Sequence, residues 1–209
     1  GSDIAGAVFS GANLSETIWP TGETCKKGSI GMCKTQAFED LLKDKKCNKC
    51  ILNQMNIPNG DFNKAVIQDT NLKDGTFTGS DFTEAELEKT DFSGSDLSKV
   101  VFAKANLSNA NLSRTKMQTA DLTGANLRNA NLSFTDLSDA KINRTRLGNT
   151  AFIGANLSNI ELTELDLRNV SFANADLKGV KFKQVKFSNA NFSGATWING
   201  QKCASRSVG

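Results

Sequence analysis

The residues best suited to chemistry in this sequence are its cysteines. Cys25, Cys33, Cys47 and Cys50 lie close together near the start, Cys203 lies near the end, and all five lie outside the interior of the repeat described below. Four clustered thiols can form disulfides, bind zinc or act as a redox pair. We expect structural disulfides, and proximity along the chain favours the pairs Cys25–Cys33 and Cys47–Cys50.

Other interpretations of these cysteines stay open. The C-x-x-C of Cys47 and Cys50 supplies half of a tetrahedral zinc site, although Cys25 and Cys33 are spaced more widely than the other half requires. Cys47 and Cys50 could also form a redox-active pair, but the sequence around them lacks the βαβ pattern of thioredoxin-like proteins. Free thiols are the remaining alternative. Because disulfides persist in oxidising compartments, the cluster predicts an extracytoplasmic location: periplasm, thylakoid lumen or secretion.

The rest of the composition offers little for catalysis. The sequence contains no His and no Tyr, so the usual general base and the commonest metal ligand are missing. No G-x-x-x-x-G-K-[ST] loop that would cradle a phosphate occurs either. We expect no catalytic residue, no metal and no cofactor, and hence a protein that is not an enzyme.

A repeat of five residues must position all other side chains. From Leu52 to Trp197, every fifth residue is Leu, Ile, Phe, Met or Trp, which makes thirty units in steps of five. This period fits neither a helix nor a strand. The residue two before each centre is usually small and shares its side of an extended chain, and the two after it favour turns. The pattern predicts short extended sides joined by corners, wound into a coil with an apolar interior.

Two features indicate that four units close one coil. Most Phe centres fall in alternate units, and the bulky replacements of the small inward residue, Ile160 and Leu165, recur twenty residues later as Val180 and Val185. Charges on one face also change sign every twenty residues: Asp81 and Glu84, Lys104, Asp121, Lys141 and Arg144, Glu161 and Glu164, then Lys181 and Lys183. With twenty residues per coil, opposite charges would face each other about 5 Å apart.

The unit itself, as in Ala120-Asp121-Leu122 and Ala125-Asn126-Leu127, resembles that of the pentapeptide repeat family, over about three quarters of the chain. The resemblance implies an all-β fold, a right-handed quadrilateral β-helix, in a bacterial or cyanobacterial protein without assigned activity. Some members resemble a DNA duplex in size and negative charge and act on topoisomerases such as gyrase. This sequence contains 22 acidic and 25 basic residues, so it lacks the strong negative charge that a DNA mimic needs. We therefore expect a non-catalytic scaffold or protein-interaction module, with DNA mimicry as the alternative.

The repeat divides the chain into four segments. Residues 1–19 hold one coil of units in another register, residues 20–49 form a cysteine-bearing insert, residues 50–199 form the main solenoid, and residues 200–209 begin a second cysteine-bearing linker. This linker copies the first, since "FSGANLSETIWPTGETCKKGSIG" aligns without gaps with "FSNANFSGATWINGQKCASRSVG". We interpret the chain as a slice of a longer protein with several solenoid cassettes; the alternative is a single domain with similar edges.

The insert also contains a predicted helix. Thr35 is a suitable N-cap, and the helix would run to about Lys45. One face of this helix combines four apolar residues: Ala37, Phe38, Leu41 and Leu42. Because the first coil of a solenoid exposes an apolar end, we expect the helix to cap it.

The surface predicts contact with protein. The net charge is only +3 and its sign alternates, so no basic stripe for nucleic acid exists. No apolar run approaches the ~20 residues of a membrane span, so we expect no membrane insertion. One nearly uncharged face carries Phe134 and Ile153 on adjacent coils, and this pair marks a site for an unidentified partner or for self-association. Scattered apolar residues without function are the alternative.

Overall fold

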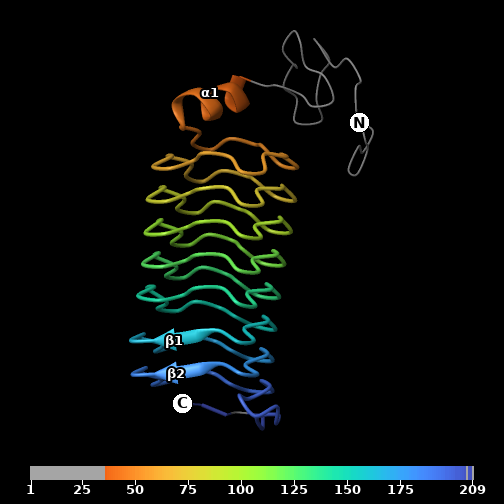
Figure 1. Cartoon of the computed structure of the whole chain (residues 1–209), viewed down its shortest axis with the longest axis vertical. Helices are drawn as coiled ribbons and strands as arrows, with labels where there is room; N and C mark the ends of the chain where they lie inside the picture. Colours follow the sequence, from red (N-terminus) through yellow and green to blue (C-terminus); the bar gives the residue numbers. More distant parts are fainter. Residues whose placement is uncertain (1–35, 206, 209) are drawn as a thin grey trace.

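The computed structural model describes residues 36–205, 207 and 208. Predictions for residues 1–19, for Thr35, for Cys25 and Cys33, and for the side chain of Phe38 lie outside these described residues. The described chain contains helix α1 (Gln36–Asp44) and strands β1 (Glu161–Thr163) and β2 (Lys181–Lys183). Everything between them winds into stacked coils, with α1 at one end of the stack (Figure 1).

Each coil takes twenty residues. Asn106 pairs in parallel with Asn126, and Asn126 pairs with Arg146, and the same step of twenty recurs along the stack. Strand β1 pairs with β2 in the same register, with Glu161 opposite Lys181. The predicted four units per coil are therefore confirmed, and the fold is a right-handed quadrilateral β-helix. We call each of its four sides a wall.

Local chemistry explains each corner. The second residue after a centre has a left-handed backbone, as at Lys104 (φ 59°) and Asn109 (φ 60°). The Leu107 carbonyl oxygen accepts a hydrogen bond from the Ala110 N–H (3.1 Å), as in a β-turn. Where Asp precedes the centre, its carboxylate accepts from the turn, as Asp91 Oδ1 does from the Ser93 N–H (2.9 Å). The Asp or Asn of the repeat thus stabilises the corner as well as facing solvent.

The apolar interior is continuous along the stack. Most of the centres are buried, and many are completely inaccessible to solvent, as at Leu107, Leu112 and Leu127. Phe centres one coil apart stack, for example Phe62 on Phe82 with ring centroids 4.6 Å apart. Between coils, the Leu107 N–H donates to the Asn126 carbonyl oxygen (2.8 Å), so backbone polar groups are satisfied along the axis.

The N-terminal end differs in part from the prediction. Helix α1 lies over the first coil and buries Leu41 (1% exposed), but Leu42 is half exposed, so its assignment to the buried face is wrong. Cys47 is buried and Cys50 packs against the core, so these two cysteines do not lie outside the repeat interior as predicted. Cys47 lies five residues before Leu52 and is itself the centre of a unit. The pairing between coils already begins in this unit, with the bridge from Lys46 to Val66.

At the other end, the chain folds back on the last coil. Antiparallel bridges join Asn191 to Val208 and Thr196 to Lys202. The Trp197 ring stacks on Phe182 with centroids 5.5 Å apart, which covers part of the last apolar layer. No helix in the described portion of the chain has the length and apolar character needed to cross a membrane.

The charge ladder is only partly confirmed. Lys104 Nζ lies 3.3 Å from Glu84 Oε1, and Lys141 Nζ lies 4.0 Å from Asp121 Oδ2, as the alternation predicts. Asp61, however, stands opposite Asp81, and its carboxylate is paired with Lys45 Nζ (2.7 Å) in the preceding turn. A second departure, between the coils of Lys141 and Glu161, forms the cleft described below.

Candidate functional site

The structure brings the predicted surface pair together. The Phe134 side chain is 59% exposed and that of Ile153 is 37% exposed. The Phe134 N–H donates to the Ile153 carbonyl oxygen (2.8 Å), so the two residues lie on adjacent coils of one wall. Two large apolar side chains therefore stand side by side at the surface.

The position of the Phe134 ring is set by its neighbours on both sides along the axis. The Arg114 guanidinium carbon lies 5.5 Å from the ring centroid, within the range of a cation–π contact. On the other side, a Cβ added to Gly154 would come within 2.8 Å of the ring carbon Cδ1. Gly154 also has φ +66°, so a residue without a side chain suits both the corner and the ring. The Phe134 ring is thus flanked along the axis by Arg114 and Gly154.

The cysteines that the structure describes form a staple at the first coil. Cys47 and Cys50 are joined in a disulfide with Cα atoms 5.8 Å apart, which matches the predicted pairing. Cys47 Sγ lies 3.6 Å from the Ala37 carbonyl oxygen, so the disulfide also contacts α1. Cys203 is a free, partly exposed thiol. Among the residues described, no three His, Cys, Asp or Glu side chains gather in a way that could hold a metal ion.

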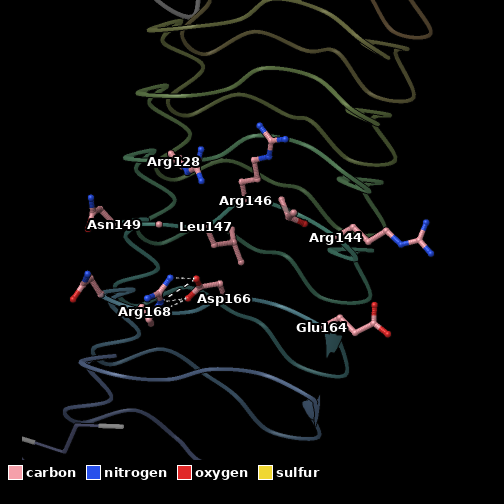
Figure 2. A pocket seen from close by; sticks show the side chains of 11 residues that line it. Arg128, Arg144, Arg146, Leu147, Asn149, Glu164, Asp166 and Arg168 are labelled. Atoms are coloured by element: carbon pink, nitrogen blue, oxygen red, sulfur yellow. Dashed lines mark hydrogen bonds and ion pairs between the residues drawn. The ribbon is translucent and has the colours of Figure 1, made fainter.

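A cleft that the sequence analysis missed opens between two coils. It measures about 630 Å³ and lies between the coil of Arg144–Asn149 and that of Glu164–Asn169. Figure 2 shows its charged lining: Arg128, Arg144, Arg146, Arg168, Glu164 and Asp166. Arg128, Asn149 and the Arg168–Asp166 pair lie at one end of the cleft, and Arg144 and Glu164 lie at the other.

The cleft forms because the coils lose their backbone pairing there. In residues 36–205, no bridge joins Lys141 to Glu161 or Arg146 to Asp166, although bridges occur at the equivalent positions of the preceding coil. Among the described residues, the N–H groups of Leu147 and Asn149 find no acceptor on the next coil, whereas those of Leu127 and Asn129 donate to the carbonyl oxygens of Arg146 and Gly148 (2.9 and 3.0 Å). The next wall stays closed, since the Phe152 N–H donates to the Ser171 carbonyl oxygen (2.7 Å).

Side-chain size explains the location. On the two open walls, the small inward residues Ala140 and Thr145 are followed one coil later by Ile160 and Leu165, both buried. A wider interior pushes these walls outward, so the wider coil no longer matches the narrower one. The following coil has Val180 and Val185 at these positions, and its backbone pairs again, with Lys181 N–H donating to Ile160 (3.0 Å). The bulky inward residues Ile160 and Leu165, which also indicate the length of one coil, are therefore the feature of the sequence that marks the cleft.

Within the cleft, one ion pair is tight. Arg168 donates from Nε to Asp166 Oδ1 (2.8 Å) and from Nη2 to Asp166 Oδ2 (2.6 Å). The hydrogen bonds from Arg168 lower the pKa of Asp166 to about 2, and the Asp166 carboxylate raises the pKa of Arg168. In the part of the chain that the structure describes, the guanidinium groups of Arg128, Arg144 and Arg146 have no hydrogen bond or ion pair. Arg144 and Glu164, which the charge ladder places on consecutive coils, form no ion pair in the described residues.

The molecule is a β-solenoid of five-residue units. Its coils have four walls and left-handed corners, and they pair in parallel at a spacing of twenty residues. The sequence matches the family model "Pentapeptide repeat region" over residues 75–152, and "Pentapeptide repeats (8 copies)" over residues 145–184 and 155–194. The chain belongs to the pentapeptide repeat family.

Solved structures share the fold. One is HetL, a pentapeptide repeat protein involved in heterocyst differentiation regulation in the cyanobacterium Nostoc; its TM-score is 0.56 at 20% identity, over 76% of this chain and 89% of that one. Another is QnrB1, a plasmid-mediated fluoroquinolone resistance protein, with a TM-score of 0.58 at 18% identity over 72% of this chain and 83% of that one. No curated protein sequence matches this chain significantly.

Proposed function

We propose that this chain is a non-catalytic scaffold that binds a protein partner through the wall of Phe134 and Ile153. The single observation that supports this most is the exposed Phe134 ring, held between Arg114 and Gly154 beside a second exposed apolar side chain. A rigid aromatic side chain loses little conformational entropy on binding, so it is an effective anchor. Apart from Arg114, the surrounding wall carries mostly small, uncharged residues, which suits close contact.

Replacing the two exposed apolar side chains by serine tests whether this wall binds a partner. The double substitution Phe134→Ser with Ile153→Ser leaves the buried core intact, because both side chains point to solvent. Ile198→Ser is the matched control, since Ile198 is also exposed (41%) but lies at the C-terminal end. Sedimentation of the pure protein and cross-linking in its source cells should show an association that the double variant loses and the control keeps. Equal association in all three proteins would refute the proposal.

We further propose that the protein works in an oxidising, extracytoplasmic compartment, where the Cys47–Cys50 disulfide would persist. Mass spectrometry of protein isolated from its source, alkylated before lysis and kept without reductant, tests this. Cys47 and Cys50 should carry no alkyl group. Full alkylation of both would assign the protein to a reducing compartment.

Action on a topoisomerase is the alternative function. The similarity to QnrB1 supports only the fold, and the near balance of acidic and basic residues does not supply the negative surface of a DNA mimic. A gyrase supercoiling assay separates the two functions. Inhibition or protection of gyrase at stoichiometric amounts would favour the alternative over the scaffold.

A further inference from the structure

We propose that the end of the cleft between Arg128 and Arg168 binds a tetrahedral oxyanion of the phosphate type. The donors are the two guanidinium groups and the backbone N–H groups of Leu147 and Asn149. The site lies on a different wall from Phe134, so it is independent of the partner surface proposed above.

The two arginines stand in one column of the wall. Arg128, Gly148 and Arg168 are each the first residue after a centre, one coil apart. A Cβ added to Gly148 would lie 3.9 Å from both Cγ and Nε of Arg128, so the Arg128 side chain extends over the glycine toward the cleft. Figure 2 shows Arg128 on one side of the opening and Arg168 on the other, with Asn149 between them at the same end. An anion placed over Gly148 would meet a guanidinium from each side.

The backbone adds donors that point the same way. In the preceding coil, the equivalent N–H groups of Leu127 and Asn129 donate along the axis to the next coil. The N–H groups of Leu147 and Asn149 occupy the same positions one coil later, so the repeat directs them along the axis too, but in residues 36–205 they make no hydrogen bond to the next coil. Leu147 is almost fully buried, and a buried N–H without an acceptor is costly. An oxyanion with several acceptor oxygens would satisfy these groups and the arginines together.

The charge at this end favours an anion. Arg128 and Arg168 supply two positive charges at this end, and Asp166 supplies one negative charge that is already held by Arg168. That ion pair uses Nε and Nη2 of Arg168, while Nη1 makes no hydrogen bond in the described structure and stays available to a ligand. Glu164, the other carboxylate of the cleft, lies at the far end beside Arg144 (Figure 2). Guanidinium groups bind phosphate oxygens in preference to neutral acceptors because both the charge and the fork geometry match.

Titration of the ¹⁵N-labelled protein with inorganic phosphate at low ionic strength tests the site. The amide signals of Leu147 and Asn149 should shift and saturate, while those of Leu127 and Asn129 should not. Arg128→Gln should weaken binding about tenfold, which is the loss of one charge-assisted contact. Arg144→Gln, at the far end of the same cleft, is the matched control and should bind normally.

A parallel titration with glycerol phosphate identifies the source of the ligand. Tighter binding of the ester than of inorganic phosphate would assign the site to a phosphate group on a larger molecule, and the reverse order to the free ion. Either order supports the site. No saturating shift with either compound, or equal binding by the Arg128→Gln variant, would overturn the proposal. So would slow hydrogen exchange at Leu147 and Asn149 without ligand, because it would mean that the cleft is closed in solution.

Discussion

Arg146 and Asp166 occupy consecutive coils at the same position of one wall, yet no ion pair joins them. The register of twenty residues that pairs Asn126 with Arg146 should bring Arg146 opposite Asp166. Asp166 instead binds Arg168 within its own unit, with Nη2 and Oδ2 2.6 Å apart, and in Figure 2 Arg146 points toward the preceding coil. This relationship shows that, within residues 36–205, the pairing between coils is interrupted at one place.

The interruption should depend on side-chain volume. Replacing Ile160 by Ala and Leu165 by Thr would narrow the coil to match Ala140 and Thr145, so the walls should close. The amides of Leu147 and Asn149 should then become as protected from hydrogen exchange as those of Leu127 and Asn129, which donate to the next coil. The substitutions also remove buried carbon atoms and should cost about 2–5 kcal/mol per large truncation. Unchanged exchange in a variant that remains folded would mean that another feature opens the cleft.

The Arg168–Asp166 pair should be visible as a low pKa. The hydrogen bonds from Arg168 lower the pKa of Asp166 to about 2, below the 3.8 of an isolated Asp, so the pair's contribution to stability is complete above about pH 4 and disappears as the pH falls through about 2. Because both side chains are exposed, the effect on stability should be small. Carboxyl NMR titration should show the pKa of Asp166 rising toward 3.8 in an Arg168→Gln variant. An unchanged titration would rule out Arg168 as the cause.

A charge in the interior should destroy several coils together. Leu127 is completely buried in the middle of the stack, and Leu127→Asp would place an unpaired carboxylate among apolar side chains. We expect a loss of at least about 3 kcal/mol in the free energy of unfolding. Leu42→Asp is the control, since Leu42 is half exposed and should tolerate the change. Urea denaturation followed by circular dichroism measures both, and equal midpoints would contradict the assignment of the core.

Gly154 should be more sensitive than Gly148 to gaining a methyl group. Gly154→Ala combines a left-handed φ of +66° with a contact of 2.8 Å to the Phe134 ring, so it should cost about 1 kcal/mol or more. Gly148→Ala meets nothing closer than 3.9 Å and should change stability by less than about 0.5 kcal/mol. Thermal denaturation of the two variants tests whether Gly154 is required for the position of Phe134. Similar melting temperatures would count against that requirement.

The sequence by itself determined the wall and the corner of this fold. Each large centre with a small residue two positions before it specifies an inward face, and each following polar pair specifies a turn, because both effects act within five residues. Alternating charges such as Glu84 and Lys104 then revealed the coil length, since opposite charges are stable when stacked. The exposed pair of Phe134 and Ile153 followed from the same register.

Only the tertiary structure decided where the coils separate and how the stack begins. The cleft depends on the width of one coil relative to the next, a difference between side chains twenty residues apart that no single unit contains. The burial of Cys47 and the exposure of Leu42 likewise depend on how α1 lies on the first coil. Local patterns specify each unit, whereas the fit between neighbouring coils is a packing property that appears only when the units are assembled.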